Sequence, residues 1–386
     1  MKWATAILAI LVLGLVGLGI AVQASISNVQ GIILNGNPNH FLTQQVFYFL
    51  IALVCCITVA AINPDFWVRP KVAYLTGFCV ILALLSVHFP VIGKTTNGST
   101  RWIYIFGISL QPSEFVKLMA IMLMAWWQSR AECKNDDFKQ GTLYPMLGLG
   151  VVAGGFFSQP DFGSIIMLGA VNVPILIAAG ARWKHVTPFA VLGILLVGAL
   201  VLRDPERLSR VTSVFGGTSQ VTTVGNDDTY QLEQSRAAIK SGGLYGTGFG
   251  SSVFKQSYLP ENHTDFVYAM ICEEMGFVVA LPCIFLFICL MWCGIWISLR
   301  APTSFTRLLA FGMALHIGLC AGVNLGVVTG ALPTKGLALP FLSYGGSSLV
   351  SSMIAIGFIM AVGWRCPSAP RASRSHYDVD RRVWVS

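Results

Sequence analysis

The residues best able to do chemistry lie in four polar segments that interrupt long apolar stretches. These segments cover residues 98–118, 159–163, 258–276 and 332–350. Ionisable side chains are costly to keep at membrane depth or at a membrane rim, so each of them is a functional candidate by default. These segments contain carboxylates, which suit proton transfer, and a few cations and hydroxyl groups, which suit the binding of an anionic group.

The first polar segment carries a carboxylate and an ammonium group on one helix face. Pro112 opens a helix, and Glu114 and Lys117 then lie three residues apart. They form either a structural pair, in which each charge neutralises the other, or part of a polar substrate cavity, and the sequence leaves both open. Arg101 lies at the outer rim, where a guanidinium can clamp a phosphate or can anchor the chain beside Trp102.

The segment at 258–276 places carboxylates around the start of a helix. Thr264 can cap a helix that begins near Asp265, and the positive end of that helix would keep the Asp265 carboxylate ionised. An Asp in a first turn is ordinarily capping chemistry, and the residues alone favour that structural interpretation. At about 100° per residue, Glu273 and Glu274 point to different sides of the helix, so we expect them to serve different environments.

The two remaining polar segments contain turns. Asp161 follows Pro160 in a hairpin, where turn formation alone explains it. Lys335 is the one charge in its outer loop. Residues 343–348 form a tight turn whose free backbone N–H groups can meet an anion. His316 is alone in an apolar stretch, and we predict a packed core residue there rather than a ligand.

The elements that must position these residues are membrane-spanning helices. The chain of 386 residues is 55% hydrophobic and 11% charged, whereas a soluble domain carries roughly 25% charged residues. Its apolar stretches are close to the roughly 20 residues that a helix needs to cross hydrocarbon. We therefore predict an all-α polytopic membrane protein with about ten transmembrane helices, near residues 3–24, 45–62, 72–93, 111–128, 143–160, 164–181, 186–202, 266–298, 306–330 and 346–364. The stretch 266–298 is too long for a simple crossing, so its first two turns are predicted to line a cavity around Asp265.

The distribution of Lys and Arg predicts the orientation of these spans. The formal charge of +8 arises mainly from basic residues between the apolar stretches, which indicates membrane orientation rather than nucleic-acid binding. With the N-terminus inside, the short outer segments hold only Lys94, Arg101 and Lys335, and ten spans place both termini in the cytoplasm. Residues 22–24 resemble a signal-peptide cleavage site, but the length of the first apolar stretch favours a retained span.

The chain is predicted to form one membrane domain, residues 1–364, followed by a basic cytoplasmic tail, residues 365–386. The membrane domain contains a large extracytoplasmic loop at residues 203–265. Within that loop, residues 230–241 suit a short amphipathic helix that Gly242 and Gly243 stop. The ten cysteines lie in apolar stretches or in cytoplasmic segments without zinc spacing, so we expect no disulfide framework.

Five motifs, in this order, resemble the SEDS family (shape, elongation, division and sporulation), which polymerises peptidoglycan. They are TRWI with QPSEFVKL at 100–118, QPDFG at 159–163, YQ..QS..AI..GG at 230–243, YLPENHTDF at 258–266 and LPFLSYGGSSL at 339–349. The resemblance covers nearly the whole chain and is closer to the division branch, the FtsW type, than to the elongation branch. It implies the SEDS fold in a bacterial cytoplasmic membrane, at the division septum.

The resemblance also implies glycosyl transfer that polymerises lipid II on the outer membrane face during septal wall synthesis. The catalytic Asp of the family's HTDF motif corresponds to Asp265, which implies a general base for the acceptor hydroxyl. A glycoside hydrolase needs a second, acidic carboxyl group, whereas a pyrophosphate departs without protonation. Arg101, Lys335 or a divalent cation (Mg²⁺ or Mn²⁺, with Asp265 as a possible ligand) would meet the departing charge.

The matching motifs carry the residues that we expect to contact the substrate: Arg101, Glu114, Lys117, Gln234, Ser235, Glu261, His263, Thr264, Lys335, Ser343 and Ser347. The resemblance implies three kinds of partner: lipid II, a class B penicillin-binding protein acting as the transpeptidase, and other division proteins. No nucleic acid is expected.

Two other functions stay open at this point. A transporter that flips lipid II would need Glu114 and Lys117 within the membrane more than Asp265 at its rim. Such transporters usually show paired repeats, which are not visible in this sequence. A scaffold that recruits division partners without chemistry would tolerate substitutions in the polar segments but not in the tail.

Overall fold

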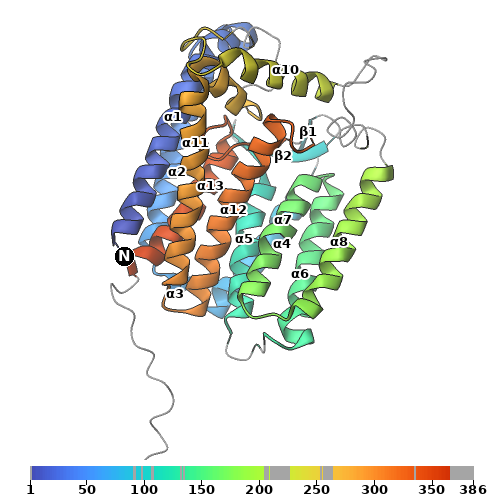
Figure 1. The fold of residues 1–386 in the computed structure, drawn as a ribbon. Coiled ribbons are helices and arrows are strands. Elements are labelled where there is room, and N and C mark those ends of the chain that lie inside the picture. Colours follow the sequence, from blue (N-terminus) through green and yellow to red (C-terminus); the bar gives the residue numbers. More distant parts are fainter. Residues whose placement is uncertain are drawn as a thin grey trace, which may run out of the picture.

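The computed structural model describes residues 2–89, 93–96, 99–105, 108–130, 133, 135–203, 208, 227–252, 254, 264–333 and 336–365. This part of the chain is a bundle of long helices, with a small sheet and one further helix, α10, at one end (Figure 1). The long helices are α1 Lys2–Asn35, α2 His40–Ala61, α4 Pro70–Ser86, α5 Pro112–Gln128, α6 Tyr144–Ser158, α7 Phe162–Ala178, α8 Trp183–Arg203, α11 Val267–Leu299, α12 Ser304–Val328 and α13 Gly346–Arg365. Shorter elements are α3 Pro64–Trp67, the π-helical turn η1 Phe138–Leu143 and α10 Asp227–Gly242.

The helices fall on the predicted spans, and the all-α membrane fold class is confirmed. Within the described residues, seven helices are long and apolar enough to cross a membrane, and α4 and α7 are shorter apolar helices. α5 is also short and carries the charged residues Glu114 and Lys117. The number of ten spans therefore stays a prediction.

The first helix, α1, is an integral part of the bundle. It packs against α2, α11 and α13, and its residues Leu8, Leu15 and Ile26 are fully buried. Its helix continues well past the predicted end of the first span, to Asn35. This packing supports the retained span over the signal peptide.

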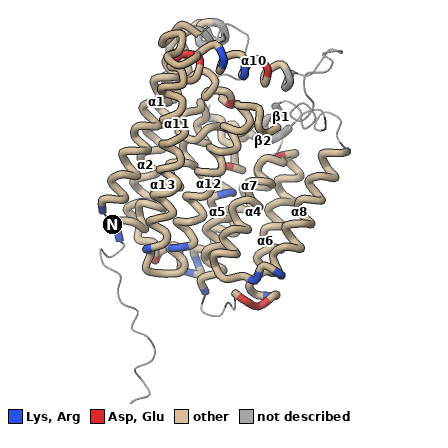
Figure 2. The backbone as a smooth tube through the Cα atoms, viewed as in Figure 1, with Lys and Arg blue, Asp and Glu red and all other residues tan. Residues whose placement is uncertain are grey.

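The start of α1 and the end of α13 lie at the same end of the bundle. A Cβ atom added to Gly363 would lie 2.2 Å from the Cγ2 atom of Thr5. Figure 2 shows Lys and Arg gathered at this end, where the N-terminus lies, and α10 at the opposite end. We call the two ends the terminal end and the α10 end. An even number of crossings, as predicted, gives this arrangement.

Burial divides the bundle into inner and outer helices. The inner helices α12 and α13 are mostly buried, whereas Val186 is the single buried residue of α8. α13 packs against α2, α5 and α12. The polar segments of α5 and α13 are therefore held in the interior, while the apolar surface of α8 is free to face lipid.

The long helix α11 consists of two helices joined at Gly276. Gly276 has φ 68° and ψ −175°, a backbone conformation that is essentially restricted to glycine. The break separates residues 267–275 from 277–299. The length of the stretch therefore correctly indicated more than a simple crossing, and the cavity predicted around Asp265 stays a prediction.

The loop that follows α10 binds the backbone on both sides of this break. The N–H groups of Thr247 and Gly248 donate to the carbonyl oxygens of Glu273 and Glu274, at 2.8 and 3.1 Å. In return, the N–H groups of residues 277 and 278 donate to the carbonyl oxygens of residues 243 and 244, respectively, both at 3.1 Å. The loop thus satisfies backbone groups that the break removes from the helical pattern.

A three-stranded antiparallel sheet lies at the α10 end (Figure 1), where the sequence predicted only a loop. Its strands are β1 Gly93–Thr96, β2 Ser99–Ile105 and β3 Ile108–Leu110, in the order β1-β2-β3. Ile103 pairs with Gly93 on one side and with Leu110 on the other. The sheet leads directly into α5 and so fixes the entry of its polar first turn.

Residues 337–345 form a buried non-helical segment between α12 and α13. Backbone in a membrane interior needs internal partners, and this segment has them. The Gln23 side chain of α1 donates to Leu342 O at 3.3 Å, and Gln45 of α2 donates to Ser343 O at 3.4 Å. The Ser343 hydroxyl accepts from the N–H of Leu339 at 2.8 Å. We call residues 336–345 the inner loop.

Candidate functional site

Asp265 lies two residues before the start of α11, at the α10 end of the bundle. The residue that precedes the helix is Phe266, whose side chain does not cap it, so Thr264 does not occupy the predicted cap position. The helix begins two residues later than expected, which places Thr264 and Asp265 in a turn, both partly exposed. A Cβ atom added to Gly336 would lie 3.0 Å from Asp265 Oδ2. The Asp265 carboxylate therefore faces the inner loop at a position without a side chain.

The buried Asn324 of α12 joins Asp265 to the inner loop. Its Nδ2 atom donates to Asp265 O at 2.8 Å and to Leu337 O at 2.6 Å. Asn324 is 1% exposed, and a buried amide that binds two carbonyl oxygens fixes both segments. Sequence reasoning missed this residue, because a lone Asn in an apolar stretch gives no motif signal.

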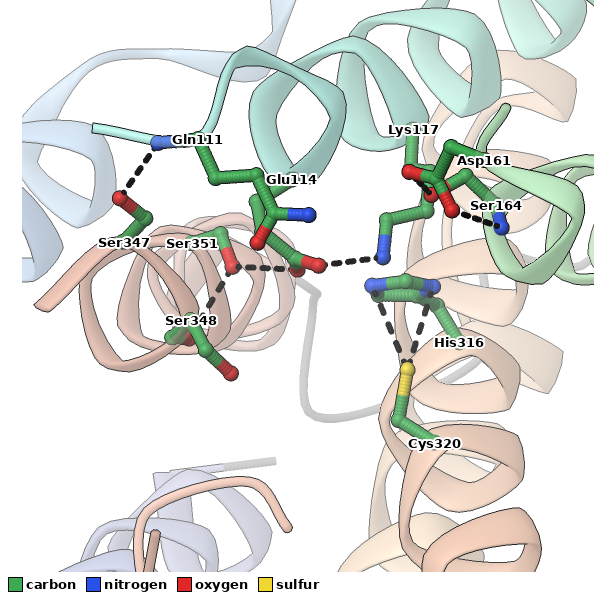
Figure 3. Close-up of polar contacts among 10 residues, drawn as sticks. All are labelled: Gln111, Glu114, Lys117, Asp161, Ser164, His316, Cys320, Ser347, Ser348 and Ser351. Atoms are coloured by element: carbon green, nitrogen blue, oxygen red, sulfur yellow. Dashed lines mark hydrogen bonds and ion pairs between the residues drawn. The ribbon is translucent and has the colours of Figure 1, made fainter. Parts of the chain in front are cut away.

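A polar pocket lies between α5, α12, α13 and the inner loop, and Figure 3 shows several of its residues. Lys117 Nζ lies 2.7 Å from Glu114 Oε1, and the Lys117 side chain is 2% exposed. Ser351 Oγ donates to the other Glu114 oxygen at 3.4 Å. The pocket is small, with a volume of about 10 Å³ that gives room for roughly one water molecule, and it is lined by Glu114, Lys117, His316, Ile317, Cys320, Leu337, Ala338, Pro340, Ser348 and Ser352. The pair thus lines a polar cavity while each charge neutralises the other.

His316 is buried, as predicted for a packed core residue, and it also lines this pocket. Its ring nitrogens lie 3.8 and 3.9 Å from Cys320 Sγ, and the Lys117 ammonium lies between its ring and Glu114 (Figure 3). Residues 337, 338 and 340 of the inner loop also line the pocket. The inner loop therefore forms a wall of the pocket and also contacts Asp265.

Arg101 ties the sheet to the turn between α6 and α7. Its Nε atom donates to Gln159 O at 3.3 Å, and its NH2 atom donates to Pro160 O. In the same turn, Asp161 caps α7 by accepting from Ser164 N at 3.1 Å and from Ser164 Oγ at 2.7 Å. The structural interpretation of Asp161 is therefore confirmed. A phosphate contact of the half-buried Arg101 stays a prediction.

All three serines that were predicted to contact the substrate bind backbone groups. Ser343 accepts within the inner loop, and Ser347 accepts from Gln111 N at 2.9 Å, which joins the start of α13 to the start of α5. Ser235 of α10 donates to Val328 O at 2.9 Å and is fully buried. Gln234 lies beside it, half-buried. These hydroxyl groups position the elements around the site.

Tyr344 lies near the end of the inner loop and packs against α2 at the α10 end. Its hydroxyl donates to the Gln44 side chain of α2, and its ring packs edge-on against Phe41, with centroids 5.2 Å apart. Burial raises the pKa of Tyr344 to about 12. Its hydroxyl therefore stays protonated, and a donor, at neutral pH.

The remaining predicted contacts, Glu261, His263 and Lys335, lie outside the described residues. In the described part of the chain, no group of three or more His, Cys, Asp or Glu side chains could hold a metal ion. The predicted Mg²⁺ or Mn²⁺ therefore remains a prediction. The cysteines that the structure describes are all free.

The chain matches known sequences along most of its length. A family model for FtsW, RodA and SpoVE, described as "Cell cycle protein", matches residues 5–365. The probable peptidoglycan glycosyltransferase FtsW of Coxiella burnetii is 38% identical over 360 residues, which cover 91% of this chain and 94% of the relative. The probable peptidoglycan glycosyltransferase FtsW of Alkalilimnicola ehrlichii is 36% identical over 97% of this chain and 93% of its own length.

Solved structures show the same arrangement of helices. A chain from a study of how a peptidoglycan synthase complex coordinates polymerization and crosslinking superposes with a TM-score of 0.74, at 24% identity over 94% of this chain and 98% of that one. The rod shape determining protein RodA of Thermus thermophilus superposes with a TM-score of 0.64, at 23% identity over 94% of this chain and 97% of its own. At this level of identity, the likeness shows a shared fold.

Proposed function

The chain belongs to the FtsW, RodA and SpoVE family of cell cycle proteins, and from this premise we propose that it is a peptidoglycan glycosyltransferase that polymerises lipid II. The membership rests on the match over residues 5–365 and on relatives that carry that activity in their names. The observation that carries the mechanism is the position of Asp265, whose carboxylate faces Gly336 at the α10 end of a membrane-spanning bundle.

In the proposed reaction, the Asp265 carboxylate acts as a general base. It accepts the proton of the acceptor sugar hydroxyl while the hydroxyl oxygen attacks the anomeric carbon of lipid II. The bond to the undecaprenyl pyrophosphate breaks at the same carbon, and the pyrophosphate leaves as an anion that needs no proton. One carboxylate therefore suffices, in contrast to glycoside hydrolases, which need two.

The negative charge of the departing pyrophosphate needs cationic or N–H partners. We expect Arg101 and Lys335 to supply them, helped by the turn at residues 343–348 and by a divalent cation. The position of Arg101 supports this expectation, since β2 leads towards α5 and Arg101 is only half-buried there. No step of the proposed mechanism depends on the cation.

The membrane domain explains how a lipid-linked substrate reaches Asp265. The undecaprenyl chain stays in the bilayer, where the exposed apolar side chains of α8 and its neighbours are compatible with it. The α10 end then faces outwards and both termini lie in the cytoplasm, in agreement with the gathering of Lys and Arg at the terminal end (Figure 2). We expect the protein at the division septum, working with a class B penicillin-binding protein and other division proteins.

A second candidate function, transport of lipid II across the bilayer, has one observation in its favour. Glu114 and Lys117 form a buried pair that lines a polar pocket within the bundle, and intramembrane charge of this kind often marks a transport path. A transporter would depend on this pair and would not require the Asp265 carboxylate.

The test is a polymerisation assay on fluorescent lipid II, with the purified full-length protein and its cognate transpeptidase. Wild type should form glycan ladders and Asp265→Ala should form none. The matched control is Asp136→Asn, which breaks an exposed ion pair with Arg182 (3.1 Å) and should leave the ladders unchanged. Ladders from Asp265→Ala would overturn the mechanism. No ladders from wild type would overturn the polymerase and favour the transporter.

A further inference from the structure

The segment between α10 and Asp265 is attached to α11 before it reaches the catalytic position. Ser252 Oγ donates to Glu273 Oε2, and Phe254 N donates to Glu273 Oε1 at 3.5 Å. Thr247 adds two bonds to the Glu273 carbonyl oxygen, from its N–H at 2.8 Å and from its hydroxyl at 3.1 Å. One residue of α11 therefore binds three positions of this segment.

Burial makes these contacts strong determinants of position. Glu273 is 1% exposed and Ser252 is 4% exposed. A buried carboxylate is stable only when hydrogen-bond donors surround it. If the carboxylate is removed, its buried donors are left without a partner, which costs free energy. The carboxylate and the segment consequently hold each other in place.

The attachment point lies close to the catalytic position along the same short helix. Glu273 lies six residues beyond Val267, where α11 begins, which is about 9 Å along the helix axis. Phe254, at one end of the stretch that leads to Thr264, is thus bound to Glu273, and Thr264, at its other end, lies just before the same helix. That stretch contains Glu261 and His263, two of the predicted substrate contacts.

From this geometry we propose that Glu273 is a positioning residue for glycosyl transfer. Its carboxylate holds Ser252 and Phe254 against the short helix at residues 267–275, and thereby holds the position of this helix and of Asp265 just before it. The proposal rests on the polymerase function proposed above. It assigns Glu273 no contact with the reacting atoms.

The chain offers a matched control in the next residue. Glu274 is also buried, at 3% exposure, and Ser25 Oγ of α1 donates to its two carboxylate oxygens at 3.1 and 2.8 Å. Its side chain thus faces α1, whereas the Glu273 side chain faces the segment, in agreement with the prediction that the two glutamates serve different environments. Glu274→Gln therefore tests the general effect of neutralising a buried carboxylate here.

The experiment measures kcat and KM for fluorescent lipid II with the full-length protein and its transpeptidase. We expect Glu273→Ala to lower kcat/KM by about tenfold or more, mainly through a raised KM, since hydrogen bonds to a charged group are lost. Glu273→Gln keeps an acceptor oxygen and should restore most of the activity. Ser252→Ala should cause a smaller loss, and no further loss when combined with Glu273→Ala.

A second readout does not depend on activity. Hydrogen exchange of the backbone in residues 247–254 should rise in Glu273→Ala and in the milder Ser252→Ala, and should stay as in wild type in Glu274→Gln. The inference is overturned if Glu273→Ala keeps wild-type kinetics, if Glu274→Gln loses as much, or if the two substitutions at Ser252 and Glu273 are additive. A wild type without polymerase activity would overturn the proposed function as well.

Discussion

At the scale of single residues, Glu114 and Lys117 agree with both interpretations that the sequence left open. They form an ion pair and they also line a polar cavity. Their side chains are 13% and 2% exposed. Breaking a buried ion pair by removing one partner is strongly destabilising, whereas replacing the whole pair is often nearly neutral. Substitutions can therefore separate the contribution of the pair to stability from its contribution to function.

We expect Lys117→Met to lower the free energy of unfolding by about 3–5 kcal/mol, because it leaves the Glu114 carboxylate buried without its cation. Adding Glu114→Gln to the same chain should recover most of the loss. Thermal unfolding of the purified protein, followed by tryptophan fluorescence, measures both effects. A single variant as stable as wild type would contradict the expectation. Activity in the stable double variant would show that the pair is structural only.

At the scale of elements, the break in α11 separates the helix that carries the site from the helix that spans the bundle. Residues 267–275 are bound by the loop after α10, and residues 277–299 pack within the bundle. The placement of Asp265 thus depends on Gly276, where the two parts meet.

Gly276→Ala should destabilise the protein by at least about 1–3 kcal/mol, because only glycine readily adopts this backbone conformation. The added Cβ would also lie 2.3 Å from the backbone N of Gly246 and 2.5 Å from Leu244 O. The control is Gly322→Ala in α12, where nothing lies within 4 Å of the added atom, so that stability should stay equal or rise slightly. The measurement is the thermal unfolding midpoint of each variant, which should be lower for Gly276→Ala than for Gly322→Ala. Equal midpoints would contradict the prediction.

At the scale of the whole molecule, the described helices place the start of α1 and the end of α13 together, opposite α10 (Figure 1). The positive-inside rule then predicts a cytoplasmic terminal end. Alkaline phosphatase, which is active only outside the cytoplasm, should be active when fused after Gly250 and inactive when fused after Cys133 or Arg365. Activity at Cys133 would contradict the predicted orientation.

Much of this architecture could be predicted from the sequence, because the length of an apolar stretch reports a membrane-spanning helix directly. The helix at α10 was also predicted, from its polar pattern and its terminal glycines. The sheet was not, since strands of a few residues depend on pairing rather than on their own composition. For the site, motifs located Glu114 and Lys117. Asn324 was missed, because it acts on the backbone of Asp265, 59 residues away in sequence.

The inner loop sets an order of assembly on the growing chain. The helices α1 and α2 are synthesised first, yet Gln23 and Gln45 bind carbonyl oxygens that arrive some three hundred residues later. A Cβ on Gly19 would lie 2.5 Å from Phe341 O, so α1 carries a glycine at the place where the inner loop packs against it. The bundle is thus completed only when its last-made part docks on its first-made part. Chains truncated before residue 336 should consequently insert into the membrane and remain open, which makes them substrates for membrane quality control rather than partly active enzymes.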